Sequence, residues 1–341
     1  MKKSLMTLGV LALFVLMAYG QEKKFALYSV AFYNMENLFD TIHDEGKNDY
    51  EYLPNGTNQW NTMKYKAKLK NMSEILSMLS TDKLPMGPAI IGVSEIENYR
   101  VLEDILKQPA LADRGYQYVH YEGADQRGVD CAFFYNPKLF ELTNSKLVPY
   151  VYINDTVHKT RGFLIASGNI AGEKMHFIVN HWPSRAATSP ARERAGEQVR
   201  AIKDSLLKEA SAAKIVIMGD MNDDPMDKSM AVALGAKRKP ADVGPTDLYN
   251  PWWDTLKKGY GTLMYKGKWN LFDQIVFTGN LLGTDRSTLK FYKHEIFRRD
   301  FMFQKEGKYK GYPKRTQAGG VWLNGYSDHL PTIIYLIKEV K

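Results

Sequence analysis

Apolar residues recur along the chain in two patterns, and these predict an alternating order of strands and helices. Short runs rich in β-branched and aromatic residues are typical of buried strands. Nine such runs occur, at Phe25–Tyr33, Ala89–Val93, Tyr116–His120, Cys131–Tyr135, Phe163–Gly168, Met175–Asn180, Ile215–Met218, Gln274–Phe277 and Thr332–Ile337. The segments between several of these runs repeat their apolar residues every three or four positions, which is the period of a helix with one buried face.

Three segments have this helical period. In the first, apolar side chains follow one another at intervals of four, three, four and three residues: Tyr65, Leu69, Met72, Leu76 and Leu79. A second helix is predicted over Val101–Ala112, and a third begins with Ser189 as N-cap and Pro190 at the first helical position. The polar residues 40–62 predict a long loop. No linker rich in Pro, Gly or Ser divides the chain, so residues 21–341 are expected to form one α/β domain.

The first 20 residues have the pattern of a secretory signal peptide. Lys2 and Lys3 precede the apolar run Leu8–Ala18, and a small-x-small site ends at Gly20. The run is shorter than the roughly 20 residues of a membrane-spanning helix, and no Cys follows it to carry a lipid. We therefore expect cleavage after Gly20 and a secreted or periplasmic protein without a stable membrane anchor.

Composition narrows the class of protein without naming an activity. With 44% hydrophobic and 25% charged residues in 341 positions, the chain is an ordinary globular protein, which excludes collagen-like and mostly disordered classes. Its single cysteine, Cys131, excludes a disulfide framework and a multi-cysteine zinc site, and is expected to be buried. Removal of Lys2 and Lys3 lowers the formal net charge from +8 to +6. This charge permits an anionic partner but does not establish one.

Six polar clusters lie directly beside predicted strands, where α/β sheets usually place their functional sites. In chain order they are Asn34-Met35-Glu36-Asn37, Ser94-Glu95-Ile96-Glu97-Asn98, Asn180-His181-Trp182-Pro183-Ser184-Arg185, Gly219-Asp220-Met221-Asn222-Asp223, Phe272-Asp273-Gln274-Ile275 and Ser327-Asp328-His329-Leu330-Pro331. Each alone is compatible with a turn or a solvated surface. A carboxylate at the end of a buried strand is costly, however, unless it is paired or binds a cation. Their recurrence is therefore the main functional signal.

The residue types in these clusters favour a hard cation. Carboxylates, amides and histidines occur together without a cysteine ligand, and the chain has neither an H-E-x-x-H nor a G-x-x-x-x-G-K motif. Oxygen-rich ligation favours Mg²⁺, or Mn²⁺ or Ca²⁺, over zinc. Such a cation beside histidine and arginine suits hydrolysis of a phosphate ester, because the positive charges neutralise the phosphoryl group while a carboxylate or histidine moves protons.

The order of the clusters resembles the endonuclease/exonuclease/phosphatase superfamily, and the resemblance runs from Asn34 to Pro331. The matching motifs are N-x-E-N, S-E-I-E-N, H-W-P-S-R, G-D-x-N-D, F-D-Q-I and S-D-H-x-P, of which the last and G-D-x-N are the most distinctive. The H-W-P-S-R form is similar to secreted bacterial members called extracellular nucleases. The resemblance implies a deoxyribonuclease I-like fold, a four-layer α/β/β/α sandwich of two packed mixed β-sheets flanked by helices.

The resemblance also implies roles for individual residues. Glu95 is implied to be the principal metal ligand, with Asn34 and Asp328 close to the ion. Glu36 stands where many relatives have Asp, and it is a further candidate for the metal shell. Catalytic roles are implied for Asp220 as the group that orients or deprotonates water, Asn222 as a phosphate ligand, Asp273 as the partner of His329, His329 as a phosphate contact and His181 as general acid. Additional phosphate contacts are implied for Arg127 and Arg185, although a plain surface position is an equal alternative for both.

The substrate is left open among several phosphate esters, because a fold does not fix a function. A nuclease acting on DNA or RNA is expected first, because of the mature charge of +6, the secretion signal and the deoxyribonuclease-like His181. The basic stretch Lys305–Arg315 could follow a nucleic-acid backbone, with a solvated loop as an equal alternative. The protein is expected to be a monomer. A phosphatase or phosphodiesterase for sugar, inositol or nucleotide phosphates is the alternative. A sphingomyelinase would need an exposed apolar hairpin, for which Trp252-Trp253 is the only candidate. A binding module without catalysis is disfavoured by the full set of motifs.

Overall fold

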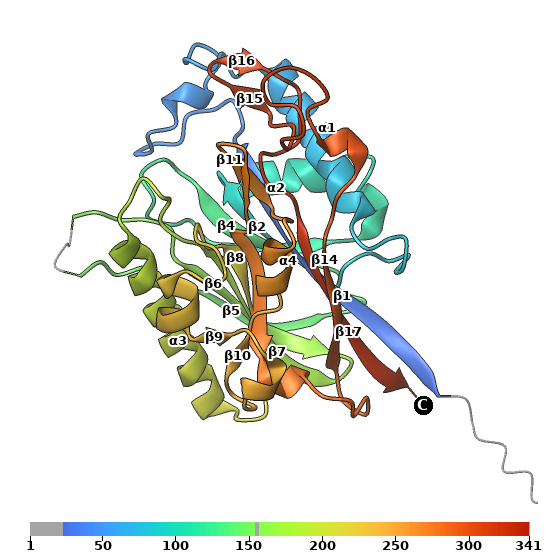
Figure 1. Ribbon diagram of the computed structural model, residues 1–341. Coiled ribbons are helices and arrows are strands. Elements are labelled where there is room, and N and C mark those ends of the chain that lie inside the picture. The colour runs from blue at the N-terminus through green and yellow to red at the C-terminus, as the bar shows by residue number, and fades with distance from the viewer. Residues whose placement is uncertain (1–22, 154–156, 341) are drawn as a thin grey trace, which may run out of the picture.

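A computed structural model describes residues 23–153 and 157–340, and two mixed β-sheets form the centre of the protein (Figure 1). In spatial order the first sheet contains β14 (Lys290–Ile296), β17 (Thr332–Val340), β1 (Lys24–Leu38), β2 (Ile90–Ile96), β4 (Asp130–Tyr135) and β3 (Gln117–His120). The second contains β5 (Glu141–Val148), β6 (Phe163–Ile170), β7 (Glu173–His181), β8 (Lys214–Asp220), β13 (Asp273–Thr278), β10 (Leu248–Tyr249) and β9 (Ala236–Lys237). Parallel pairing of β1 with β2 and of β7 with β8 brings the C-terminal ends of each pair together.

The sheets pack face to face, with helices on the two outer faces (Figure 1). Because side chains alternate along a strand, Val30 and Phe32 of β1 enter the core between the sheets, whereas Ala31 and Tyr33 face the helices. The helices α1 (Thr62–Met78) and α2 (Tyr99–Leu106) cover the first sheet, and α3 (Ser189–Glu209) covers the second. The predicted four-layer α/β/β/α sandwich is thus confirmed.

Shorter elements decorate this sandwich. They are α4 (Trp253–Lys257), the hairpin of β11 (Leu263–Tyr265) and β12 (Lys268–Asn270), the pair β15 (Gln317–Ala318) and β16 (Val321–Trp322), 3-10 turns at Tyr50–Tyr52, Ala112–Arg114, Pro240–Asp242, Gly279–Leu281 and Asp300–Met302, and a π-helical turn at Ser229–Leu234. Figure 1 shows β11, β15 and β16 at the same end of the molecule, above the sheets in this view.

All nine predicted strands are present, but two long strands were not predicted. These are β5 and β14, which form one edge of each sheet. Both are only partly buried and contain many polar residues, as in Glu141–Val148. An edge strand lacks a neighbour on one side and its side chains meet more solvent, so its sequence does not show the apolar run of a central strand.

Four predicted boundaries of helices and strands need correction. Helix α2 spans Tyr99–Leu106 rather than Val101–Ala112, because the Asn98 side chain accepts hydrogen bonds from the backbone of Arg100 and Val101 and so starts the helix earlier. Its C-terminal part is replaced by loop and a 3-10 turn. The N-cap of α3 is Thr188 rather than Ser189, and its side chain makes no capping hydrogen bond. Strand β1 continues to Leu38, so the first polar cluster lies within its irregular end rather than after it.

Two further expectations concern single residues of the described chain. Cys131 is buried, as predicted. Trp252 is also fully buried and donates a hydrogen bond from Nε1 to the carbonyl of Ile275, so the Trp252-Trp253 pair does not form an exposed apolar hairpin. The proposed signal peptide lies outside the described residues. Within residues 23–153 and 157–340, no helix has both the length and the apolar character required to span a membrane.

Candidate active site

Side chains from both sheets meet at one end of the sandwich. Strand register aligns three of them, because His181 on β7 pairs with Asp220 on β8, and Asp220 pairs in turn with Asp273 on β13. Asn34 near the end of β1 and Glu95 on β2 approach from the first sheet. His329 joins them from the segment before β17. Six residues far apart in sequence are thus placed together by strand pairing and sheet packing.

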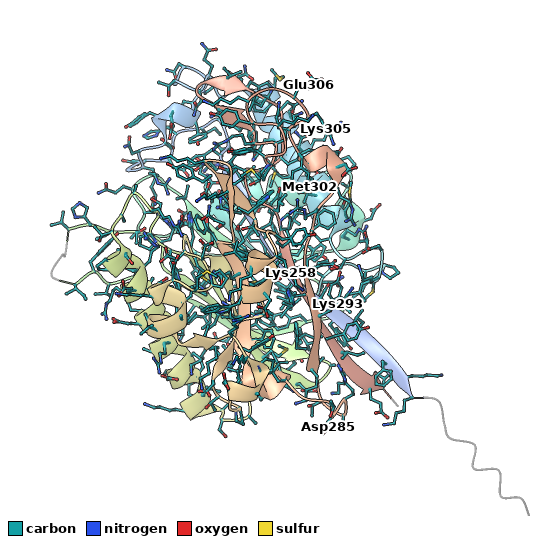
Figure 2. The ribbon with its side chains drawn as sticks, viewed as in Figure 1. Lys258, Asp285, Lys293, Met302, Lys305 and Glu306 are labelled. Atoms are coloured by element: carbon teal, nitrogen blue, oxygen red, sulfur yellow. The ribbon has the colours of Figure 1, made fainter. Side chains whose placement is uncertain are left out.

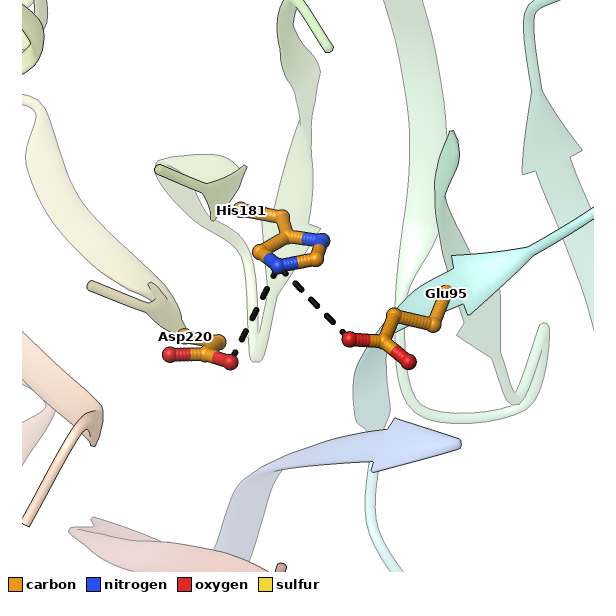
Figure 3. Close-up of side chains that lie close together, drawn as sticks. All are labelled: Glu95, His181 and Asp220. Atoms are coloured by element: carbon orange, nitrogen blue, oxygen red, sulfur yellow. Dashed lines mark ion pairs between the residues drawn. The ribbon is translucent and has the colours of Figure 1, made fainter. Parts of the chain in front are cut away.

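Asp220 lies at the centre of this group. Its Oδ2 accepts a hydrogen bond from Asn34 Nδ2 at 3.0 Å. The same oxygen lies 3.9 Å from His181 Nε2 and 3.8 Å from His329 Nε2. Figure 3 shows His181 directed toward both Asp220 and Glu95, with 3.7 Å between His181 Nε2 and Glu95 Oε1. One carboxylate is therefore shared by two histidines that approach from different strands.

Glu95 is held in a fixed orientation by strained backbone. Its φ of +60° is in the left-handed region, where non-glycine residues are uncommon and cluster at functional sites. Asn34 Nδ2 donates to Glu95 Oε1 at 3.1 Å, and the backbone of Asn37 donates to Oε2 at 2.9 Å. Glu36 and Asn37 also have positive φ values, of 46° and 54°. The strand ends thus bend sharply where they present their carboxylates.

The cluster fits a divalent cation. Ligand atoms of Glu95, His181 and Asp220 all lie within 4.8 Å of one another. Burial raises the pKa of Asp220 to about 7, and the negative charges of Asp273 and Glu95 add to this effect although His329 opposes it. A cation among these carboxylates would offset the cost of their burial. The two carboxylates, Glu95 and Asp220, are donors compatible with Mg²⁺ or Mn²⁺.

Asn34 is close to this cluster but does not direct its oxygen into it. Its Oδ1 accepts a hydrogen bond from the backbone of Glu36 at 2.8 Å, which fixes the orientation of the amide. Its Nδ2 consequently faces Glu95 and Asp220 as a donor. In this arrangement Asn34 holds the two carboxylates together, and its ligation of the ion stays a prediction.

His329 is paired with a buried carboxylate. Asp273 is fully buried, and its Oδ2 lies 2.7 Å from His329 Nδ1. Burial alone opposes the imidazolium, but the negative charges of Asp273 and Asp220 outweigh it and raise the pKa of His329 well above its ordinary value. Nε2 is thereby turned toward Asp220 with a proton to donate.

His181 has the opposite environment. Burial lowers its pKa well below the ordinary value, and the positive charges of Arg161 and Arg127 add to the effect. Its Nδ1 is buried and has no hydrogen-bond partner among the described residues. Arg161 is itself buried and donates to the carbonyl of Trp182 at 2.8 Å and to Asp125 Oδ2 at 2.9 Å. Sequence analysis missed Arg161, although its place directly before a strand matches that of the other clusters.

Glu36 and Asp328 are joined by an arginine that sequence analysis did not assign to the site. Arg315 donates from Nε to Glu36 Oε1 and from a terminal nitrogen to Asp328 Oδ2, both at 2.9 Å. Glu36 Oε2 also accepts from the backbone of Thr316 and lies 3.9 Å from Lys68 Nζ. Burial raises the pKa of Glu36 to about 7, with a further contribution from Asp328. Glu36 therefore lies among cations of the protein, beside the main cluster rather than within it.

Lys68 and Arg315 gave only weak signals in the sequence. Lys68 is fully buried on α1, where it donates to Thr316 Oγ1 and to the carbonyl of Tyr326. It lies on the buried face of the helix, between Tyr65 and Leu69, and the apolar spacing of that face is complete without it. Arg315 ends the basic stretch noted above. Both could have been found only by asking which cations neutralise Glu36 and Asp328.

Asn222 follows Asp220 on a turn with a positive φ of 51°. Its backbone donates to Asp220 Oδ1 at 2.9 Å, and its Nδ2 donates to the carbonyl of Trp182. Arg185 donates to the Asn222 carbonyl, stacks 4.4 Å from the ring centre of Phe272 and pairs with acidic residues of the same loop: Asp223, Asp224 and Asp227. Arg185 is thus strongly held by carboxylates.

Arg127 is the more accessible of the two predicted phosphate contacts. About half of its side chain is exposed, and its Nε lies 3.5 Å from Asp125 Oδ1. Its charge nevertheless reaches His181. The phosphate-binding roles of Arg127, Arg185 and Asn222 stay predictions.

The sequence model of the Endonuclease/Exonuclease/phosphatase family matches residues 29–338. The chain belongs to this family. No curated protein sequence matches the chain. All six motifs lie within the matched residues. Members of this superfamily are metal-dependent hydrolases that act on phosphate esters.

Solved structures of the family share the fold at low sequence identity. A Bacteroides thetaiotaomicron endonuclease/exonuclease/phosphatase family protein is 14% identical, with a TM-score of 0.58 over 93% of this chain and 97% of that chain. The mannosyl-6-phosphatase of the same organism is 14% identical, with a TM-score of 0.56 over 91% and 99%. D. rerio TDP2 in complex with a single-strand DNA product is 15% identical, with a TM-score of 0.53 over 91% and 99%. These similarities establish the fold, and the substrate has to be argued from the site.

Proposed function

We propose that this family member is a metal-dependent nuclease that hydrolyses phosphodiester bonds by attack of water. The observation that carries the proposal is the arrangement about Asp220, whose Oδ2 lies within 4 Å of both His181 Nε2 and His329 Nε2 and beside the amide of Asn34. Two proton-carrying groups on either side of one carboxylate can serve the attacking and the leaving oxygen of the same phosphate.

Each residue then has a defined task. Glu95 and Asp220 would hold Mg²⁺, or Mn²⁺ or Ca²⁺, which supplies charge neutralisation for the phosphoryl oxygens. Asp220 orients the attacking water and accepts its proton. His329, fixed by Asp273, donates a hydrogen bond to a phosphate oxygen. His181 gives a proton to the leaving oxygen, because an anionic phosphate bound beside it favours the imidazolium that burial and Arg161 oppose.

Charge and similarity favour nucleic acid among the phosphate esters. The chain from residue 21 has a formal net charge of +6, and the Lys305–Arg315 stretch lies near the site through Arg315. A polyanion gains affinity from such cations by counterion release. The similar fold of D. rerio TDP2, solved with a single-strand DNA product, supports the same class of substrate. The mannosyl-6-phosphatase of B. thetaiotaomicron supports the alternative, a small phosphate monoester.

A substrate panel tests this proposal. Purified protein is assayed on single-stranded DNA, duplex DNA, RNA, mannose 6-phosphate and p-nitrophenyl phosphate, each with Mg²⁺, Mn²⁺, Ca²⁺ or EDTA. We expect cleavage of nucleic acid that needs metal and weakens steeply as salt increases. Release of phosphate from the small esters with all nucleic acids left intact would replace the nuclease by a phosphatase. The Asp220→Asn variant is the matched control for a contaminating nuclease.

We also propose that the protein acts outside the cytoplasm as a single domain of residues 21–341. The proposal rests on Lys2, Lys3 and the apolar run Leu8–Ala18, which precede a small-x-small site. Expression of the full chain in a bacterium should give an exported protein that begins at Gln21 by N-terminal sequencing. Deletion of residues 2–20 should retain the protein in the cytoplasm, and an unprocessed Met1 on the exported form would contradict the proposed cleavage.

A further inference from the structure

A cavity of about 810 Å³ lies beside the active site, between the β11–β12 hairpin and the segment 304–323. Three tyrosines line it, Tyr265, Tyr309 and Tyr312, and we call it the tyrosine groove. Arg315 and Asp328 also line it, so the groove opens directly onto the edge of the catalytic cluster. Its volume is within the roughly 300–1,000 Å³ of small-molecule sites, which leaves room for a nucleotide-sized group.

One wall of the groove is attached to a catalytic residue. Leu263 of β11 forms an antiparallel bridge with His329, and the backbone of Leu330 donates to the carbonyl of Thr262 at 2.9 Å. The hairpin turns at Lys266 and Gly267, which both have positive φ values as a tight two-residue turn requires. The hairpin therefore presents Tyr265 at a fixed distance from the site.

The opposite wall is attached to the other side of the site. Arg315 bonds to both Glu36 and Asp328, which anchors the segment that carries Tyr309 and Tyr312. The walls are also joined to each other, because the backbone of Gly267 donates to the Tyr312 hydroxyl at 2.6 Å. Figure 2 labels Lys305 and Glu306 at the outer end of this segment, at the same end of the molecule as β11 in Figure 1.

The lining combines accessible aromatic rings with three cations, Lys266, Lys308 and Arg315, and with two acids, Glu306 and Asp328. Tyr265 is 62% exposed and Tyr309 is 52% exposed, so solvent and ligands can reach both rings. The Lys266 ammonium lies 5.3 Å from the Tyr265 ring centre, and the Lys308 ammonium lies 5.6 Å from that of Tyr309. Flat rings accept the face of a base, while the cations next to them meet the adjoining phosphates.

We propose that the tyrosine groove binds a nucleobase of the substrate strand next to the reacting phosphate. The inference rests on the proposed nuclease function and deepens it, because an unstacked base is available only in single-stranded or locally opened nucleic acid. The groove would make the enzyme prefer single strands and would place the phosphate between Arg315 and the catalytic histidines.

Binding measured without catalysis tests the inference. A fluorescent single-stranded oligonucleotide and an abasic one with the same phosphates are titrated with protein in EDTA, and their anisotropy is followed. We compare wild type with Tyr265→Ala, Tyr309→Ala and Tyr309→Phe. The control is Tyr292→Ala, which removes a 52% exposed tyrosine from β14, outside the groove lining.

Loss of a stacking ring should weaken binding of the base-containing strand about tenfold in each alanine variant. Binding of the abasic strand should change less than about twofold, and both Tyr309→Phe and Tyr292→Ala should behave as wild type. Equal affinity of wild type for the two strands, or equal losses on both in the alanine variants, would overturn the inference. Base-dependent binding without any metal-dependent cleavage would support the groove and overturn the nuclease assignment instead.

Discussion

The two histidines of the active site occupy similar positions but opposite electrostatic environments. Each Nε2 lies within 4 Å of the same Asp220 oxygen, and both side chains are buried. His329 has Asp273 at its Nδ1, whereas His181 has the cation Arg161 nearby and no hydrogen-bond partner for Nδ1 among the described residues. Consequently the pKa of His329 is raised and that of His181 is lowered.

This difference shows what determines the charge of a buried histidine. Burial lowers the pKa of both, so burial cannot distinguish them. The charged neighbours of the two rings distinguish them. A carboxylate at Nδ1 favours the imidazolium of His329, whereas a nearby guanidinium disfavours that of His181. Before substrate binds, the site therefore has a cationic histidine and a neutral histidine about one shared carboxylate. His181 becomes a proton donor only when the negative charge of a bound phosphate raises its pKa.

Removal of the shared carboxylate should have the largest effect. Asp220→Asn keeps the shape of the side chain but removes the charge that both histidines and the metal depend on. We expect kcat on DNA with Mg²⁺ to fall by about 10³-fold or more. The control is Asp227→Asn, a more exposed acid that pairs with Arg185 and lies outside the cluster. Turnover of Asp220→Asn within tenfold of wild type, with unchanged circular dichroism, would refute the central role of this residue.

Exchange of each histidine for glutamine tests whether the two sides do different chemistry. A general acid matters most for a poor leaving group, so His181→Gln should lose roughly 10²–10³-fold in kcat on DNA but far less on an ester that releases p-nitrophenol. His329→Gln should lose similar amounts on both substrates, because a phosphate contact is needed whatever the leaving group.

The leaving-group dependence is the decisive readout of this pair. If His329→Gln rather than His181→Gln is rescued by the p-nitrophenyl ester, the two roles are exchanged, as the raised pKa of His329 would also allow. Equal losses for both variants on both substrates would remove the distinction between the two sides.

Replacement of Asp273, the carboxylate partner of His329, should give His329 an electrostatic environment like that of His181. Asp273→Asn keeps a hydrogen-bonding group at Nδ1 but removes its charge, and the amide can stabilise the wrong tautomer of His329. We expect kcat to fall about 10²-fold with KM little changed. A fall in melting temperature large enough to explain the whole loss would assign Asp273 to stability instead.

Sequence reasoning reached the residues of this site more readily than their environments. Asp220 and His329 were found because the polar clusters follow strands and keep the order of a known family. The pairing of Asp273 with His329 was predicted from the family resemblance alone, because no local pattern connects two residues that lie 56 positions apart. Arg161 and Lys68 were missed for the same reason, since a lone cation carries no signal until the carboxylates that it neutralises are located in space.

The fold shows the same division between local and non-local information. Most of the nine predicted strands have apolar runs because both of their faces are buried, whereas the edge strand β3 was found although it is only partly buried. The edge strands β5 and β14 were missed, since their polar residues read as loop. The curved end of β1 was missed as well, because the positive φ values of Glu36 and Asn37 serve the site rather than the strand.

His294 offers the smallest but cleanest test of the principle, because it is a partly buried histidine with no carboxylate partner among the described residues. It lies on β14, where Thr255 Oγ1 is 2.9 Å from its Nε2 and the Trp252 ring packs edge-on at 4.8 Å. Burial lowers its pKa to about 4, and the charge of Lys258 (Figure 2) adds to the effect. Its pKa is therefore lowered for the same reason as that of His181, although His294 lies outside the active site.

Since the folded pKa is below the unfolded value of about 6.5, the contribution of His294 to stability is full above pH 6.5. It is lost as the pH falls toward 4, because the unfolded chain then takes up a proton that the folded chain refuses. Urea unfolding should show a loss of at most about 3 kcal/mol from this group over that interval. In His294→Gln the pH dependence should be shallower by that amount, with turnover at pH 7 unchanged. Parallel stability curves for the two proteins would show that burial without a carboxylate partner does not control the charge of a histidine in this fold, and would remove the electrostatic basis for a neutral His181.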